Sequence, residues 1–592
     1  MKPDLKKQVR LLILCLVIIA ASSLIAYGVE RDFGKVDVQI VRFADPTGVI
    51  LTGKLYRPVA ATPQNKLPGV LCLHGFQNDK DTQDAFAIEL SRRDFVVLAI
   101  DQFGHGSSGG HMSLAPADPS NGGDAGYKYL KSLPFVDAAN LGVMGHSMGA
   151  GSTIAVGKMN PDHKALNPQC GVAGSPDLHN VLLTQARYEE FAGFREGQLN
   201  PLSLTTNPAR LKALGLTGTV AWDTTYGDFA NGTARRVALV DTVHPGVTHN
   251  AKAVAEAVEW MRQALKQATS DAASQRLAYN QIYMWKEWMT LLALLATALS
   301  TIPLANILLA RPYFAPVAQP IATKHTNSAG GWLLLALVNA LIGGVTYPFL
   351  TGIGMMLGLS IPWLRLPMGN GVMLWFLVNA LVCGILFTVW YRTRAKKAGL
   401  TLADLGASGG WPIVGKTVLL AIILFGWMYI LESISESALG VEFRFLWPFM
   451  RQFTPLRFGL FLMYLVPALA FFLVNGGLFL FGQASQKECA SAWKAQLAWW
   501  LKNCFAALFG LLLVWGLQYV PYFLGVGPGF ELIGLATFSG MWPLMLFVLI
   551  PEFLFLLFLL TWFYRRTGRI YLGALMVASL AIWFTAAGSV IF

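Results

Sequence analysis

Charge is scarce in this 592-residue chain, because only 13% of its residues are Asp, Glu, Lys or Arg whereas 54% are hydrophobic. A typical soluble domain carries about 25% charged residues. The shortage is not uniform: residues 31–270 have ordinary charge, whereas apolar runs long enough to cross a bilayer follow one another from Trp288 to Phe592. The sequence therefore excludes a wholly soluble protein and predicts an integral membrane protein with one water-soluble domain.

Patterns typical of metal, redox and nucleic-acid sites are also missing. The six cysteines are scattered, and no C-x-x-C pair or other metal-like spacing occurs. Cys72 and Cys170 are the only two in the soluble domain, and we expect no disulfide between them. The net charge of +12 arises from basic residues in short loops between apolar runs, where they set membrane orientation. We therefore expect no metal, no organic cofactor and no nucleic-acid partner.

The first 30 residues lack a clear signal-peptide cleavage site. An unbroken apolar run, Leu11–Gly28, follows Lys2, Lys6, Lys7 and Arg10 and is long for the hydrophobic part of a signal peptide. We predict that residues 1–30 form a retained transmembrane anchor with a cytoplasmic N-terminus, which places the domain at residues 31–270 outside the cytoplasm.

After a polar connector at residues 271–287, a membrane domain at residues 288–592 is predicted. Its eight apolar spans lie near 288–310, 331–350, 371–391, 413–431, 458–481, 504–524, 541–564 and 571–592. An apolar, glycine-interrupted segment, Thr351–Leu364, is a candidate for re-entering the membrane. Glu552 stands in the middle of one span, where a carboxyl group is costly and is either functional or a packing contact.

The loop charges predict the orientation of these spans. The loops expected in the cytoplasm carry Arg311, Lys324, Arg392, Arg394, Lys396, Lys397, Lys487, Lys494, Lys502, Arg565, Arg566 and Arg569. The opposite loops carry Arg365, Arg444, Arg451 and Arg457 together with Glu432, Glu436, Glu442 and Glu531. This bias predicts nine spans in a plasma or inner membrane, with the C-terminus outside the cytoplasm.

The soluble domain reads as an α/β fold. Two alternating segments, Val36–Arg42 and Val49–Tyr56, flank a turn and predict an antiparallel hairpin. Continuous apolar strands, one of them at Cys170–Gly174, then alternate with helices as far as a final helix at 251–267. This alternation predicts a mostly parallel sheet covered by helices on both faces, followed by an all-α membrane domain.

Gly145-His146-Ser147-Met148-Gly149 lies between an apolar strand and a run of small residues that begins a helix. In a G-x-S-x-G turn of this kind, the serine adopts a strained conformation that lifts its hydroxyl clear of the sheet. Glycine at the flanking positions lets the neighbouring chain pass closely. The pattern predicts that Ser147 is a catalytic nucleophile.

A serine nucleophile needs a base, and the base needs an orienting acid. The base should follow the last strand, where His249 abuts the last helix and is preferred, with His244 as the alternative. Glu189 is the preferred acid. Its alternatives are Glu190, Asp223 and Asp228.

An acyl-transfer site also needs donors for the developing oxyanion. The backbone N–H groups of Met148 and Phe76 are the candidates. His74 and His146, beside them, are assigned to the substrate-binding wall. His74 is expected to be structural rather than catalytic. The segment Asp101–Gly110 lacks the Lys-Ser/Thr ending of a phosphate-binding loop, so we interpret it as a turn lining the site.

Residues 35–268 resemble the α/β-hydrolase superfamily. The resemblance rests on His74-Gly75-Phe76, Asp101–Ser107, Gly145–Gly149 and His249 in this order, and it is greatest to esterase, dienelactone-hydrolase and prolyl-oligopeptidase-like members. It implies a sheet of eight strands and a Ser-His-acid triad. The chain departs from the family pattern because the usual lid between strands six and seven is nearly absent, and Ser175–His179 bridges these strands directly. The insertion Phe191–Ala234 is instead the candidate cap over the pocket.

Together these observations predict a membrane-anchored serine hydrolase that cleaves carboxylic esters, such as lipid or acyl esters, through an acyl-enzyme. One alternative is an acyltransferase or serine peptidase with the same triad. A second is a transporter or scaffold whose hydrolase domain binds a ligand without catalysis. The expected partners are a small-molecule or lipid ester and the bilayer, and the oligomeric state stays open.

Overall fold

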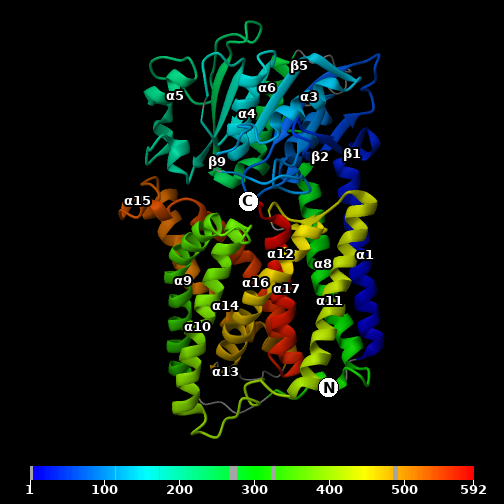
Figure 1. Cartoon of the computed structure of the whole chain (residues 1–592), viewed down its shortest axis with the longest axis vertical. Coiled ribbons are helices and arrows are strands. Elements are labelled where there is room, and N and C mark those ends of the chain that lie inside the picture. Colours follow the sequence, from blue (N-terminus) through cyan, green and yellow to red (C-terminus); the bar gives the residue numbers. More distant parts are fainter. Residues whose placement is uncertain are drawn as a thin grey trace.

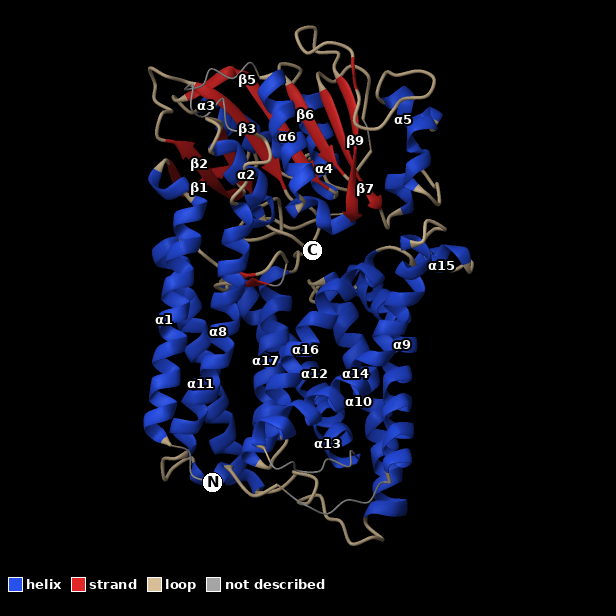
Figure 2. Ribbon diagram, turned by 180° about the vertical axis from the view of Figure 1, so that it is seen from behind, coloured by secondary structure: helices blue, strands red, loops and turns tan. Residues whose placement is uncertain are grey.

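The computed structural model describes residues 4–113, 115–172, 174–265, 277–321, 328–447, 449–483 and 491–592. The predicted domain boundary at 270/271, residues 271–276 of the predicted connector, and Lys324 and Lys487 lie outside these residues. A sheet domain stands on one end of a bundle of long helices (Figures 1 and 2).

The sheet is mostly parallel, as the alternation of strands and helices predicts. Its strands are β1 (Val36–Ala44), β2 (Ile50–Pro58), β3 (Leu67–Leu73), β4 (Val96–Ile100), β5 (Val136–His146), β6 (Ala165–Gln169), β7 (Val181–Tyr188), β8 (Thr225–Tyr226) and β9 (Arg235–Val243). Their order in the sheet is β1-β2-β4-β3-β5-β6-β7-β9-β8. The predicted hairpin is confirmed as the antiparallel pair β1–β2. In the series β4, β3, β5, β6, β7 and β9, each strand pairs in parallel with the next.

The sheet has nine strands rather than the eight implied by the family resemblance. The additional strand, β8, comes from the insertion after β7 and pairs antiparallel with β9. It is only two residues long and lies at the sheet edge.

Alternation along β3 builds a core on each face of the sheet. Val70 and Cys72 face a cluster with α2 (Asp84–Ser91) and α6 (Ala251–Ala264), whereas Leu71 and Leu73 face a cluster with α3 (Gly123–Ser132) and α4 (Met148–Met159). These side chains are fully buried. Strands that are apolar on both faces belong in a parallel sheet covered on both sides.

The helical bundle comprises α1 and α8 to α17. Its helices are α1 (Leu5–Glu30), α8 (Tyr283–Leu309), α9 (Ala329–Ser360), α10 (Pro367–Trp390), α11 (Gly410–Leu439), α12 (Pro455–Leu473), α13 (Leu480–Gln483), α14 (Ala492–Phe523), α15 (Gly529–Leu532), α16 (Met541–Thr567) and α17 (Tyr571–Gly588). Within the described parts of the chain, nine helices are long and apolar enough to cross a membrane. They match the predicted anchor and eight spans.

Two segments differ from the sequence expectations. Thr351–Leu364 does not turn back, because α9 continues through it to Ser360 despite its glycines and Pro348. The strand predicted at Cys170–Gly174 lies earlier, as β6.

The chain termini lie at opposite ends of the helical bundle. The N-terminus is at the end far from the sheet, and the C-terminus lies between the sheet domain and the bundle (Figure 1). There, the N–H of Ile591 donates to the Gly104 carbonyl at 2.8 Å and the N–H of Met112 donates to the Ile591 carbonyl at 2.8 Å. The segment after α17 is thus bound directly to the sheet domain.

Candidate active site

Ser147 stands at the sharp turn between β5 and α4. Its backbone angles, φ 57° and ψ −115°, are rare for a residue with a side chain. Its N–H donates to the Gln169 carbonyl at the end of β6 at 2.8 Å, which holds the turn against the sheet. The side chain is partly exposed.

The flanking glycines allow this turn to form. A Cβ on Gly145 would stand 2.8 Å from the Leu73 carbonyl oxygen, and a Cβ on Gly149 would stand 2.6 Å from the His74 carbonyl oxygen. Both distances are too short for any side chain. The backbone of β3 and its following loop therefore passes directly beside the turn, as expected of a nucleophile elbow.

His244, rather than His249, is paired with the predicted acid. Its Nδ1 lies 2.8 Å and 2.9 Å from the two carboxylate oxygens of Glu189, which is fully buried. Strand register explains the pairing: Tyr188 at the end of β7 is opposite Val243 at the end of β9, so the residues that follow them, Glu189 and His244, meet. With the proton on Nδ1, the ring keeps a free electron pair on Nε2.

His249 lies five residues later, at the end of a 3₁₀ turn, and faces a different environment. Its Nδ1 is 2.9 Å from the Thr248 hydroxyl, and its Nε2 is 3.7 Å from Glu287 of α8. His249 does not line the cavity described below. The geometry thus favours the alternative base of the sequence analysis over the preferred one.

The two glutamates after β7 differ in their contacts. The Glu190 carboxylate accepts hydrogen bonds from the His244 N–H at 2.8 Å and from the Tyr519 hydroxyl of α14 at 2.9 Å. Burial, together with the adjacent Glu189 charge, raises the pKa of Glu190 to about 7. Tyr522, also on α14, donates to the Glu189 carbonyl at 2.6 Å. The helical bundle therefore holds the acid loop in place.

The other proposed acids lie elsewhere. Asp223 pairs with Lys252 at 2.6 Å, and Asp228 accepts from the N–H of Asn231 in an exposed turn. Neither residue lines the cavity that contains Ser147.

The loop after β3 passes next to Ser147. A Cβ on Gly75 would lie 3.2 Å from the Ser147 Cβ, and Phe76 lines the same cavity as the serine. Met148 is the first residue of α4, so its N–H has no acceptor within the helix. Both residues proposed as oxyanion donors thus belong to segments that flank the serine.

The two histidines assigned to the substrate wall have different surroundings. His74 is buried with its Nδ1 2.8 Å from the Gly75 carbonyl, while its Nε2 accepts from the Gln102 N–H at 3.0 Å. His74 is not part of the cavity wall, whereas His146 is. The Nε2–H of His146 donates to the His244 carbonyl at 2.9 Å. Burial, and then the nearby His244 ring, lowers the pKa of His146 well below its usual value.

A cavity of about 150 Å³ joins the elbow to the helical bundle. Its sheet-domain wall consists of Phe76, Gln77, Asn78, His146, Ser147, Phe191, His244 and Pro245. Its remaining walls come mainly from α10, α16 and α17, and Glu552 is among them. The sequence analysis missed this second half of the site, because helices read one at a time do not show which faces meet.

The predicted cap and the predicted lining turn have other positions. Of the insertion Phe191–Ala234, only Phe191 is among the described residues that line the cavity, and Arg195 of the insertion pairs with Glu531 of α15. The segment Asp101–Gly110 does not line the cavity either, and its Gly106 carbonyl accepts from Arg457 at 3.2 Å. The helical bundle itself therefore covers the elbow.

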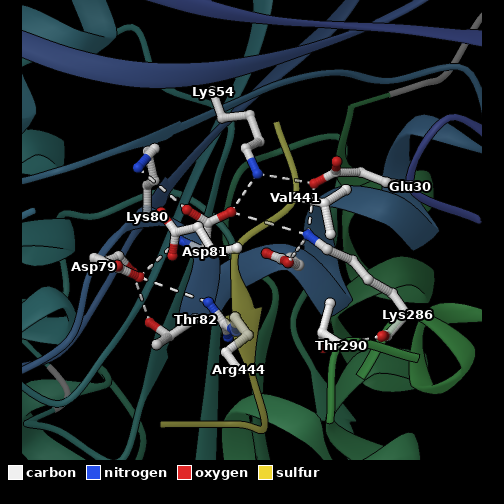
Figure 3. A network of polar contacts seen from close by, with 12 residues as sticks. Glu30, Lys54, Asp79, Lys80, Asp81, Thr82, Lys286, Thr290, Val441 and Arg444 are labelled. Atoms are coloured by element: carbon white, nitrogen blue, oxygen red, sulfur yellow. Dashed lines mark hydrogen bonds and ion pairs between the residues drawn. The ribbon is translucent and has the colours of Figure 1, made fainter. Parts of the chain in front are cut away.

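A buried network of ion pairs joins the sheet domain to the bundle (Figure 3). Lys54 of β2 lies 2.9 Å from Glu30 at the end of α1 and also pairs with Asp81, and Lys286 of α8 lies 2.6 Å from Glu30. Although burial alone would lower it, the carboxylates of Asp81 and Glu30 raise the pKa of Lys54 well above its usual value. These contacts fix α1 and α8 under the sheet.

A second part of the network reaches the loop that follows the oxyanion segment. Asp79 lies 2.6 Å from Arg451 and 3.7 Å from Arg444, both from the connection between α11 and α12. Arg444, Arg451 and Arg457 are nearly fully buried. Their positive charge is used in contacts with the sheet domain, which is why these loops carry arginines against the general charge bias.

Among the residues that the structure describes, three clusters of acidic, histidine or cysteine side chains are close enough to share a metal ion: Glu30 with Asp81 and Asp84, Asp79 with Asp81 and Glu442, and His146 with Cys170 and His244. Lysine and arginine already neutralise the two acidic clusters. In the third, burial raises the pKa of the Cys170 thiol well above its usual value, which disfavours the thiolate that a metal needs. These clusters fit ion pairing and packing better than metal binding.

The elbow at the end of β5, the mostly parallel sheet and the helices on both faces give the sheet domain the α/β-hydrolase fold. Residues 65–229 match the family model described as serine aminopeptidase, S33. No curated protein matches the chain.

Two solved structures are similar to parts of the chain. A structure of DcsB in complex with its substrate analogue is 21% identical over 23% of this chain and 46% of that one, with a TM-score of 0.21. The hypothetical protein PA2218 from Pseudomonas aeruginosa is 13% identical over 39% of this chain and 94% of that one, with a TM-score of 0.30. This chain thus covers less than half of the DcsB chain.

Proposed function

We propose that the protein is a membrane-embedded serine hydrolase that cleaves carboxylic esters, with Ser147 as nucleophile, His244 as base and Glu189 as the orienting acid. The observation that carries the proposal is the Glu189–His244 pair at the wall of the cavity that also contains the strained Ser147. A strained elbow serine, a histidine with a free Nε2 and a buried carboxylate are the parts that this chemistry requires.

In this mechanism, His244 Nε2 takes the Ser147 hydroxyl proton as Oγ attacks the ester carbonyl. The N–H groups of Phe76 and Met148 stabilise the oxyanion of the tetrahedral intermediate. The C–O bond to the alcohol then breaks, and His244 returns the proton to the leaving alcohol. Water repeats the sequence on the acyl-enzyme, so that one ester and one water give an acid and an alcohol.

The proposed location is a plasma or inner membrane, with the N-terminus in the cytoplasm and the hydrolase domain outside. This orientation is supported by the nine apolar helices found among the described residues, by the termini at opposite ends of the bundle and by the basic residues in the loops predicted to be cytoplasmic.

A serine peptidase is a second candidate because the matching family model is described as a serine aminopeptidase. Recognition of a free α-amino group calls for a carboxylate close to the scissile bond. Among the described residues that line the cavity, Glu552 is the only acidic one, and it stands ~16 Å along α16 from Met541, the first residue of that helix. The charge of the cavity wall therefore favours an ester over a peptide with a free N-terminus.

The test uses the full-length protein in detergent or nanodiscs with p-nitrophenyl acetate and butyrate. Ser147→Ala is expected to reduce hydrolysis at least about 10³-fold and to abolish labelling by a fluorophosphonate. Ser152→Ala, in the next turn of α4 and outside the cavity wall, is the matched control and should retain both. Unchanged hydrolysis in Ser147→Ala would refute the proposal, and faster turnover of aminoacyl amides than of esters would favour the peptidase. An impermeant fluorophosphonate applied to intact cells tests the orientation.

A further inference from the structure

The cavity that contains Ser147 continues between three helices of the bundle. Its deeper wall is formed by Met368, Gly369, Val372 and Phe376 of α10, by Met541, Leu544, Met545, Phe547, Val548, Leu549, Glu552 and Phe553 of α16, and by Ala581, Phe584, Thr585 and Gly588 of α17. Apart from Glu552 and Thr585, these residues are apolar. The polar side chains Gln77, Asn78, His146 and His244 stand at the sheet-domain end.

This division of polar and apolar walls matches an amphiphile. We propose that the substrate carries a long hydrocarbon chain that lies between α10, α16 and α17, with its ester group at Ser147 and a hydrogen-bonding group on the chain that contacts Glu552. The inference rests on the proposed function and adds the class of substrate and a specificity-determining residue.

The depth of the cavity sets the expected chain length. From Met541 to Glu552, α16 advances ~16 Å at 1.5 Å per residue. A chain that fills this depth buries many methylene groups, and each buried methylene strengthens binding roughly four-fold. Short acyl groups leave this space empty, so preference for longer chains is the direct consequence.

Glu552 gives the deep end of the cavity its chemistry. It follows Pro551 inside α16 and is partly exposed to the cavity. Across the described parts of the chain, no side-chain hydrogen bond or ion pair involves its carboxyl group, unlike Glu189 or Glu190. A purely hydrocarbon chain packed against it would remove its water without replacing the lost hydrogen bonds, which is costly. A hydroxyl at this depth satisfies the carboxyl instead.

The first arm of the test measures chain-length preference with p-nitrophenyl esters from two to sixteen carbons. Val372→Trp narrows the cavity at α10 and is expected to lower the ratio of kcat/KM for the twelve-carbon ester to that for the two-carbon ester at least about tenfold. Leu381→Trp lies on the same helix but is 64% exposed on the outer face of the bundle, and it should leave the ratio unchanged. Fluorophosphonate labelling of Ser147 checks that each variant is folded.

The second arm compares plain acyl esters with ω-hydroxyacyl esters of eight to sixteen carbons. At one matching chain length, the ratio of kcat/KM for the hydroxylated ester to that for the plain ester is expected to be about tenfold higher in the unmodified protein than in Glu552→Leu. Glu552→Gln, which still hydrogen-bonds, should keep most of this preference, whereas Glu552→Leu should favour plain chains. An equal ratio in the unmodified protein and Glu552→Leu would overturn the role of Glu552.

The outcomes separate the two levels of the proposal. If Ser147→Ala keeps its activity on the two-carbon ester, the proposed function fails. If Ser147→Ala is inactive but Val372→Trp and Leu381→Trp give the same chain-length profile as the unmodified protein, the function stands and the chain site in the bundle is wrong.

Discussion

Replacing His244 by alanine tests which histidine acts as the base. His244→Ala removes the ring that Glu189 orients, and it leaves Ser147 without a proton acceptor at the cavity. His249→Ala is the matched control, because this ring contacts Thr248 and Glu287 on the other side of the same turn. The two variants make the same chemical change five residues apart.

His244→Ala is expected to reduce the catalytic rate, whereas His249→Ala is expected to reduce mainly the stability of the protein. General acid–base catalysis by a positioned side chain contributes about 10²–10⁴ to the rate, so His244→Ala should lower kcat/KM by that factor, equivalent to about 3–5 kcal/mol of barrier. His249→Ala removes one hydrogen bond and one longer charge contact, so it should cost about 1–3 kcal/mol of stability with kcat/KM changed less than about threefold.

Initial rates with p-nitrophenyl butyrate and thermal inactivation of the same samples measure both effects. Fluorophosphonate labelling should slow markedly in His244→Ala and stay fast in His249→Ala, because labelling depends on the activated hydroxyl. If His249→Ala loses activity and His244→Ala keeps it, the assignment from the geometry of β7 and β9 is wrong and the sequence preference for His249 is restored.

Two further predictions concern groups around the site. The pKa of Glu190 is raised to about 7 in the folded protein, so the folded protein binds this proton more tightly than the unfolded chain does. The tighter proton binding stabilises the fold by roughly 3 kcal/mol at low pH, and this contribution is lost as the pH rises from about 4.5 through 7. The thermal stability of Glu190→Gln should therefore not decline across this pH range, whereas that of the unmodified protein should. Equal declines in the two proteins would contradict this prediction. Arg451→Met removes the nearest cation from the Asp79 carboxylate, which keeps the longer Arg444 contact and the hydrogen bond from the Asp81 N–H. It should destabilise the protein by about 3–5 kcal/mol, whereas Asp79→Asn combined with Arg451→Met should recover part of the loss. A double variant less stable than Arg451→Met alone would show that the pair is not coupled as described.

Strand pattern and spacing were sufficient to predict the sheet and the elbow. Alternation in β1 and β2 and continuous apolar runs in β3 and β5 are local signals, and Ser147 lies between a strand and a helix that are both evident in the sequence. The nine apolar helices were predictable for the same reason, since length and hydropathy are properties of one segment.

The choice between His244 and His249 required information that no single segment contains. It follows from the parallel register of β7 and β9, which brings Tyr188 opposite Val243. Both histidines follow the same strand, so spacing along the chain does not separate them. In the structure, Glu189 and His244 are each the first residue beyond this last paired position, which is why they meet.

The role of the bundle in the site was out of reach of the sequence for a different reason. Tyr519 and Tyr522 lie near the end of an apolar helix, where tyrosines are common at a membrane surface. Only their hydrogen bonds to Glu190 and to the Glu189 carbonyl show that they support the acid loop. Arg451 likewise reads as an ordinary loop charge until Asp79 is seen beside it.

The shared cavity also has a consequence for the order in which the protein is made. The sheet domain is complete by the end of α6 at Ala264, whereas α16 and α17 extend to Gly588. At about 5–20 residues per second, roughly 15 to 65 seconds separate the two during synthesis. Throughout that interval the elbow can already be folded while two walls of its cavity have not been made. If the proposed function holds, hydrolysis of long-chain esters begins only after these last two helices have been made, so the unfinished chain does not cleave esters of the surrounding membrane.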